Sequence, residues 1–166
     1  MRRRSASGTR SGPRTHASKK GRIAPNTTSR DRLTEERRSW NMSRIRGKNT
    51  APEIRVRSFL HRLGFRFRIH GGKLPGRPDL VLVKHKTVIF VHGCFWHRHK
   101  GCKNCTTPSN RRDWWLAKLN SNVARDRRHQ AALKKLGWCV IVIWECKAMS
   151  SQGLEQTLRP VLRANM

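Results

Sequence analysis

The chain has 166 residues, which is enough for one domain with a core of its own. Its 38 lysines and arginines against nine aspartates and glutamates give a formal net charge of +29, far more than solubility requires. Such a charge favours a polyanionic partner, with nucleic acid first, although ribosomal and membrane-surface proteins are also basic. No stretch approaches the ~18 apolar residues of a membrane span, and the basic start is not followed by the apolar region of a secretory signal.

Residues 1–39 are predicted to form a disordered basic tail, and residues 40–166 a folded domain. The first 30 residues carry nine lysines and arginines and no acid, with Ser, Gly, Thr and Pro between them. Such a composition cannot bury a core. We expect a solvated tail that can raise non-specific affinity for DNA.

The first predicted helix follows the capping-box pattern Thr50-Ala-Pro-Glu53 and stops at Gly64. Its core-facing residues are predicted to be Ile54, Phe59, Leu60 and Leu63. Over residues 65–69 phenylalanine and isoleucine alternate with arginine, which predicts a strand with one polar face.

A Gly/Pro-rich loop is expected over residues 70–78, followed by two adjacent buried strands at 79–83 and 87–91 that are joined by a tight turn. A long helix is predicted from about residue 109 to 136, ending at Gly137. A further buried strand at 138–144 and a short helix at about 153–164 complete the chain. This order predicts an α/β fold, with a mixed sheet that is flanked by helices.

Asp79 stands at the start of an apolar strand, where a carboxylate facing a cleft can hold Mg²⁺. A turn residue that caps the preceding loop is the alternative. The hairpin favours the metal site, because the neighbouring strand ends in Val91-His92 and brings His92 and the Val91 carbonyl near Asp79. A carboxylate, a backbone carbonyl and waters make an acceptable octahedral Mg²⁺ site.

Cysteines and histidines crowd the segment after the second buried strand. The spacing Cys94-x4-His99-x2-Cys102 predicts a zinc site, with Cys105 or Cys146 as the fourth ligand. Four protein ligands would leave no open position, so a structural role is expected. Free buried cysteines and solvated histidines remain the alternative.

Large aromatic residues lie in polar surroundings. Phe95 and Trp96 either cover the zinc-binding lobe or act as a wedge between base pairs. For the pair Trp114-Trp115, we expect one ring in the core and the other on a DNA-facing surface.

Several motifs together resemble the very short patch repair (Vsr) DNA mismatch endonucleases, over roughly residues 40–147 and in matching order. They are Asn41-Met42-Ser-Arg-Ile, Thr50-x-x-Glu53, Leu74-Pro-Gly-Arg-Pro-Asp79, Val88-Ile-Phe-Val-His-Gly-Cys-Phe-Trp-His97, Asn122-Val-Ala-Arg-Asp-Arg-Arg128, Gly137-Trp138 and Trp144-Glu-Cys146. The combination is much more specific than any single motif.

The resemblance implies a restriction-endonuclease-like core and a Mg²⁺-dependent nick of one strand beside the thymine of a T·G mismatch, which arises when 5-methylcytosine deaminates. Asp79 falls on the family's metal-binding aspartate, and the Val91 carbonyl would be the second protein ligand. Family members often have Thr at position 91, but a backbone ligand tolerates Val. His97 falls on the general acid/base, His92 on a histidine that helps order the metal-bound waters or the phosphate, and Glu53 on a supporting acid.

The same resemblance implies a structural Zn²⁺ site and a set of inserting side chains. The implied zinc ligands are Cys94, His99, Cys102 and Cys146, which leaves Cys105 as an extra cysteine. The residues that fall on inserting or stacking positions at the mismatch are Met42, Phe95, Trp96 and Trp115.

The implied substrate is double-stranded DNA with a T·G mismatch, and the implied partners are a cytosine-5 DNA methyltransferase system and general mismatch-repair proteins. A monomer in the prokaryotic cytoplasm, associated with the nucleoid, is expected. Two other functions stay open. A non-catalytic zinc-stabilised DNA-binding module explains the charge, cysteines and aromatics, but not Asp79 beside two histidines. A restriction or homing nuclease on the same core would cut both strands of a matched site.

Overall fold

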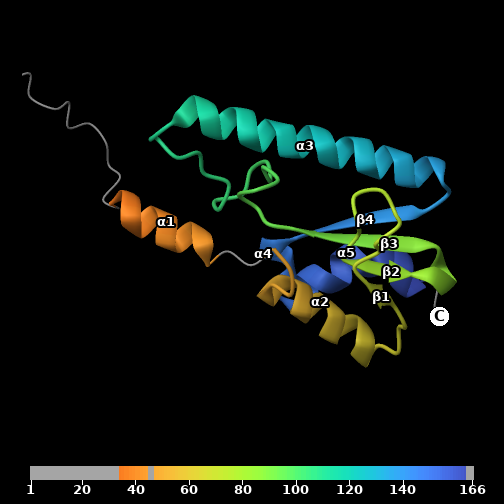
Figure 1. The fold of residues 1–166 in the computed structure, drawn as a ribbon. Helices are drawn as coiled ribbons and strands as arrows, with labels where there is room; N and C mark the ends of the chain where they lie inside the picture. Colours follow the sequence, from red (N-terminus) through yellow and green to blue (C-terminus); the bar gives the residue numbers. More distant parts are fainter. Residues whose placement is uncertain (1–33, 45–46, 164–166) are drawn as a thin grey trace, which may run out of the picture.

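The computed structural model describes residues 34–44 and 47–163 (Figure 1). Most of the predicted basic tail therefore lies outside the described residues. The first described element is helix α1 (Glu35–Ser43), which begins before residue 40 and was not predicted. The hydroxyl of Thr34 caps it by accepting a hydrogen bond from the Arg37 amide at 3.2 Å.

Helix α2 (Ala51–Arg62) confirms the predicted capping box. The Thr50 hydroxyl faces the amide of Glu53 at 3.5 Å, and the Glu53 carboxylate accepts the amide of Asn49 at 3.0 Å. The buried face consists of Glu53, Val56, Phe59 and Leu60.

The core prediction was wrong for Ile54 and Leu63, which are 50% and 46% exposed. Ile54 lies two positions from the buried Val56, and residues two apart point to different sides of a helix. Leu63 is the C-cap residue, and Gly64 with φ +81° turns the chain away from the helix there.

The sheet has four strands in the order β1-β2-β3-β4: β1 (Arg68–Ile69), β2 (Leu80–Leu82), β3 (Thr87–His92) and β4 (Cys139–Trp144). The pairs β1/β2 and β2/β3 are antiparallel and β3/β4 is parallel, so the predicted mixed sheet is confirmed. The strand expected at 65–69 shortens to two residues, because the Phe65 amide still bonds to the carbonyl of Leu60 in the preceding helix. The turn between β2 and β3 is a single 3-10 turn, η1 (Val83–His85).

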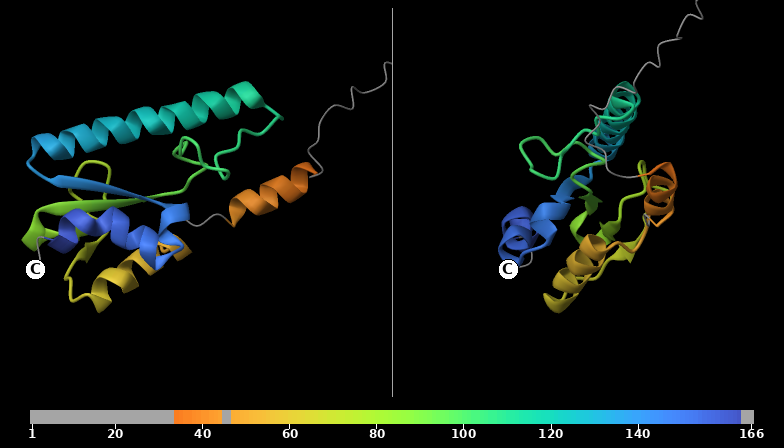
Figure 2. Two further views of the ribbon diagram at one scale, coloured as in Figure 1. Left: turned by 180° about the vertical axis from the view of Figure 1, so that it is seen from behind. Right: turned by 90° about the vertical axis from the view of Figure 1, so that its left-hand side faces the viewer.

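Both faces of the sheet are covered, as the uninterrupted apolar strands predicted. Figure 2 shows α3 (Arg112–Lys135) along one face and α2 with α5 (Ser151–Arg163) on the other. The larger core lies under α2 and α5 and includes Leu60, Leu80, Ile89, Ile143 and Leu158. The smaller core joins Val81, Val88 and Phe90 to Leu133 of α3.

A short helix that was not predicted, α4 (Glu145–Ala148), follows β4 directly and leads into α5. Among the described residues, no helix combines the length and the apolar character needed to cross a membrane.

Candidate active site and metal-binding cluster

A cleft of about 860 Å³ opens at the end of β3, and all four predicted catalytic residues line it. Its walls come from the start of α2, the loop before β2, the end of β3 and the inward face of α3. The ionisable residues that line it include Glu53, Asp79, His92, His97, Asp126, His129 and Glu145.

Asp79 and Val91 lie side by side, as the predicted hairpin requires. The Val91 amide donates a hydrogen bond of 2.7 Å to Oδ2 of Asp79. Burial raises the pKa of Asp79 above its ordinary value; the Val91 hydrogen bond opposes this shift and the nearby Glu53 charge adds to it. A carboxyl group whose negative charge is disfavoured by its surroundings is well suited to a cation, which would compensate that charge.

Glu53 lies in the same cleft but is held by its own helix. Its carboxylate accepts the Thr50 hydroxyl at 2.9 Å and forms a 2.8 Å ion pair with Arg57. With the Asn49 amide as a third donor, the buried carboxylate has partners for both oxygens. Its influence on Asp79 therefore acts through charge, across the cleft.

His92, His97 and Asp126 form a compact group in the same cleft as Asp79. The rings of His92 and His97 stack nearly parallel, 3.9 Å between centroids. Nδ1 of His97 contacts Oδ2 of Asp126 at 2.6 Å. Burial, with a smaller contribution from the neighbouring His97, lowers the pKa of His92 to about 4, against the opposing effect of Asp126. A carboxylate on one ring nitrogen of His97 fixes its tautomer and leaves Nε2 for proton transfer.

Asp126 was not among the predicted site residues. Its partner is 29 positions away in the chain, and Asp126 stands among arginines on α3, where it resembles a solvated helix residue. The signal that could have found it is the motif Asn122-Val-Ala-Arg-Asp-Arg-Arg128, which contains Asp126 and is shared with the family that the chain resembles. Asn122, one turn earlier, donates from Nδ2 to the Trp96 carbonyl at 3.2 Å. Residues four apart share a helix face, so both contact the same loop.

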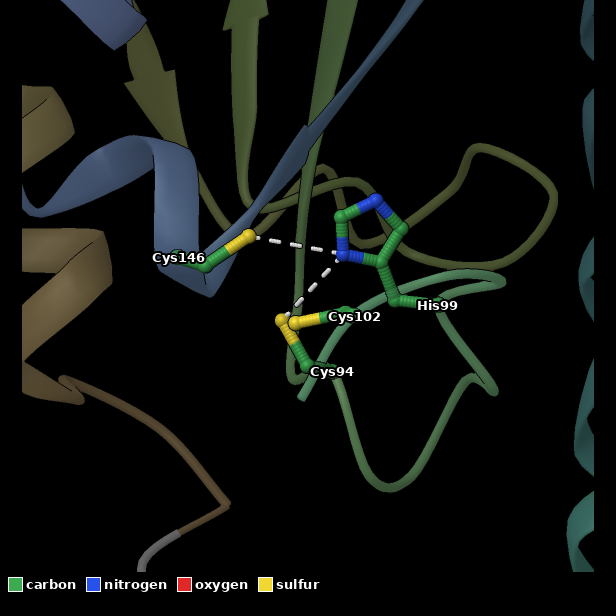
Figure 3. A group of neighbouring side chains, drawn as sticks. All are labelled: Cys94, His99, Cys102 and Cys146. Carbon is green, nitrogen blue, oxygen red and sulfur yellow. Dashed lines mark hydrogen bonds between the residues drawn. The ribbon is translucent and has the colours of Figure 1, made fainter. Parts of the chain in front are cut away.

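Cys94, His99, Cys102 and Cys146 come together beside this cleft (Figure 3), and their candidate ligand atoms lie within 4.8 Å of one another. Nδ1 of His99 is 3.5 Å from the Cys94 sulfur and 3.4 Å from the Cys146 sulfur. Cys105 is not a member of the group. We call these four residues the Cys/His cluster. Three sulfurs and one imidazole are the donor set that zinc prefers in structural sites.

The Cys/His cluster and the histidine pair share a neighbour, Trp144. Its ring stacks on the His99 ring, with 4.2 Å between the ring centroids and an angle of 5° between the ring planes. It makes a T-shaped contact with the His92 ring, with 5.6 Å between the centroids. The adjacent Glu145 accepts the Cys94 amide at 3.3 Å.

Three of the four residues predicted to insert into DNA form one aromatic group. The ring centroid of Phe95 lies 5.0 Å from that of Trp96 and 5.4 Å from that of Trp115, and all three side chains are half-buried. Trp114 adjoins Trp115 and is 57% exposed. Met42, 44% exposed, lies apart on α1.

Comparison with known proteins gives one consistent result. Residues 30–104 match the family model described as DNA mismatch endonuclease Vsr. The chain is 49% identical to the type II nicking enzyme V.XorIIP of Xanthomonas oryzae pv. oryzae over 80% of its own length and 96% of the relative. It is 47% identical to the DNA mismatch endonuclease Vsr of Escherichia coli over 70% and 74% of the two chains. It is 42% identical to the type II nicking enzyme V.NmeAIP of Neisseria meningitidis over 79% and 96%.

Replacement of Cys102 by Ser should lower both the bound zinc and the melting temperature, because Cys102 belongs to the Cys/His cluster. Replacement of Cys105 by Ser should change neither and serves as the matched control. Zinc per protein, measured by atomic emission, and thermal unfolding check both variants. Equal losses in the two variants would contradict the ligand set.

His92 should make the fold sensitive to acid. Its folded-state pKa of about 4 lies below the ordinary 6.5, so between these values the unfolded chain binds a proton that the folded chain does not. The unfolding free energy should therefore fall by about 2 kcal/mol between pH 7 and pH 5 from this residue. Urea unfolding at both pH values should show this loss reduced in His92→Asn and retained in His61→Asn, an exposed control. An identical pH dependence in all three proteins would refute the assignment.

Proposed function

Because the chain belongs to the Vsr family of DNA mismatch endonucleases, we propose that it nicks one strand of duplex DNA beside the thymine of a T·G mismatch. The observation that carries this proposal is the His97–Asp126 contact of 2.6 Å in the same cleft as Asp79. A histidine held by a carboxylate and a separate carboxylate for a cation are the groups that phosphodiester hydrolysis needs.

Asp79 is the proposed Mg²⁺ ligand, with the Val91 carbonyl as the second. The donor set fits, since hard oxygen ligands suit Mg²⁺ and Asp79 receives one backbone amide while its burial disfavours a free negative charge. When bound, Mg²⁺ polarises the scissile phosphate and orders water.

His97 is the proposed general acid/base. Asp126 holds its Nδ1, so Nε2 is the atom that exchanges a proton with water or with the leaving oxygen. His92 stacks on the His97 ring and is 6% exposed, which restricts the orientation of that ring and leaves His92 to contact the phosphate or its waters. Glu53, engaged by Arg57 and Thr50, is assigned a positioning role at the cleft wall.

The Cys/His cluster is proposed to hold a structural Zn²⁺ through Cys94, His99, Cys102 and Cys146. Because Cys94 directly precedes Phe95, Trp96 and His97, an anchored cluster would fix the loop that carries both the wedge and the acid/base.

Mismatch choice is proposed to come from the aromatic group. Phe95, Trp96 and Trp115 lie together near the cleft, and Met42 would act from α1. A mispaired step costs less to unstack than a paired one, so insertion favours the mismatch. The net charge of +29 supplies affinity for the phosphates without sequence choice.

We also infer the biological setting from the family. A cytosine-5 DNA methyltransferase system would generate the substrate after deamination, and general mismatch-repair proteins would act on the same DNA. The protein would work as a monomer at the nucleoid, since one nick needs one active site.

The purified protein should nick a T·G duplex in Mg²⁺ and leave the matched T·A duplex of the same sequence intact. Denaturing and native gels, run over all mismatches in several sequence contexts, measure this. A product seen only on the denaturing gel supports the proposal. Double-strand cleavage of paired DNA would favour the restriction or homing nuclease instead, and binding without cleavage the zinc-stabilised module.

Asp79→Asn should reduce nicking in Mg²⁺ by at least about a thousandfold while leaving DNA affinity, measured without Mg²⁺, within about twofold, because it removes a metal ligand and keeps the shape of the side chain. Glu155→Gln on α5, an exposed carboxylate that does not line the cleft, is the matched control and should nick normally. Single-turnover nicking and gel-shift binding check both variants. Normal nicking by Asp79→Asn would rule out the metal site.

A further inference from the structure

The loop that leads to Asp79 packs directly on α3 through Gly76 and His129. A Cβ atom at Gly76 would lie 2.8 Å from Cβ and from Nδ1 of His129, a separation that real Cβ atoms essentially never show. Gly76 also has φ +74°, which L side chains rarely adopt. Backbone conformation and space therefore both require glycine at this contact.

The loop is stiff between this contact and the metal-binding carboxylate. The Arg77 amide bonds to the Leu74 carbonyl at 3.0 Å, which closes the loop tip into a turn. Pro78 is fully buried and its ring fixes φ, and the amides of His70 and Gly71 tie the other end of the loop to the carbonyls of Asp79 and Pro78. Because Arg77 and Pro78, the two residues between Gly76 and Asp79, are both restrained, a displacement of Gly76 would also displace Asp79.

His129 and Asp126 lie three residues apart on α3 and line the same cleft. One face of α3 thus holds His97 through Asp126 and supports the Asp79 loop through His129. Within the part of the chain that the structure describes, the His129 ring forms no hydrogen bond, so its contact with the loop is one of packing.

We propose that His129 is a positioning residue that fixes the Asp79 loop relative to the His97–Asp126 pair and thereby sets the affinity of the cleft for a divalent cation. The inference rests on the proposed function, in which Asp79 is the metal ligand. Residues that hydrogen-bond to a metal ligand commonly change metal affinity by about 10-fold to 100-fold when they are removed, and for the packing contact of His129 we expect the lower end of this range.

Mn²⁺ binding measured by electron paramagnetic resonance tests this without any cleavage step. His129→Ala should raise the Kd for Mn²⁺ about tenfold over the wild type. His129→Phe keeps a ring against Gly76 without the nitrogens and should stay within about threefold, as packing requires. Gly76→Ala places a methyl group against His129 and displaces the loop, so it should weaken Mn²⁺ binding as His129→Ala does. If His129→Ala fails to fold, Gly76→Ala tests whether the contact between the loop and α3 sets the affinity for Mn²⁺. His61→Ala, an exposed histidine on α2, is the control and should bind Mn²⁺ as the wild type does.

The inference is overturned by an unchanged Kd in a folded His129→Ala variant, or in Gly76→Ala where His129→Ala does not fold. A His129→Phe variant that binds Mn²⁺ as weakly as His129→Ala also overturns it. A loss of affinity for paired DNA in His129→Ala with normal Mn²⁺ binding would also overturn it and identify a phosphate contact instead. Asp79→Asn separates this inference from the proposed function. If the wild type binds Mn²⁺ and Asp79→Asn abolishes this binding, but the wild type does not nick T·G DNA, the proposed function is refuted. The Mn²⁺ Kd values of the His129 and Gly76 variants still decide the role of His129 in that case. Mn²⁺ binding that survives Asp79→Asn refutes both.

Discussion

The parallel pairing of β3 with β4 is the constraint on which both candidate sites depend. Its register runs from Thr87↔Cys139 to His92↔Trp144, so the carboxyl ends of the two strands lie side by side at one end of the sheet. The next residues are Gly93 and Cys94 on one side and Glu145 and Cys146 on the other. Two segments about fifty positions apart in the sequence therefore meet there. A slip of one residue would turn the apolar side chains of β4 to the opposite faces and separate the two cysteines.

This pairing also makes the cleft and the Cys/His cluster one structural unit. Trp144 contacts His99 of the cluster on its face and His92 of the cleft on its edge. Between them runs the loop with Phe95, Trp96 and His97, which α3 holds from outside through Asn122 and Asp126. The loop is thus held at its base by the sheet and along its length by α3. A side chain that must transfer a proton at a defined position needs such support, because a displacement of about 1 Å can cost a hundredfold in rate.

Local patterns predicted what depends on local structure. The two apolar runs predicted the hairpin, and the hairpin predicted the contact between Asp79 and Val91. The pairing of two such runs is nearly decided once a short turn joins them, here the four residues 83–86. The spacing of Cys94, His99 and Cys102 was likewise readable, but the fourth member depended on the β3/β4 pairing, and the residues alone left Cys105 and Cys146 open. Asp126 was missed although it stands in the quoted motif Asn122–Arg128, because nothing in the local sequence shows which side chain a lone acid among arginines will contact. Its role appears only when α3 crosses the sheet and brings it to His97.

The few acidic residues of this basic chain are concentrated in the cleft. In the proposed function, this placement couples the binding of a cation to the binding of DNA. Of nine aspartates and glutamates, Glu53, Asp79, Asp126 and Glu145 all line the cleft. Arg57 pairs with Glu53 and His97 with Asp126, whereas Asp79 and Glu145 each receive a single backbone amide within the described residues. A phosphate drawn in by the surrounding positive charge meets these carboxylates in the cleft, at short range and partly desolvated. The negative phosphate and the carboxylates repel each other, and a divalent cation on Asp79 would reverse this repulsion. Bound metal should therefore raise the affinity for DNA, and bound DNA the affinity for the metal. The same linkage would favour cleavage only when both are present, since the cation would offset the charge of the carboxylates that the phosphate meets in the cleft.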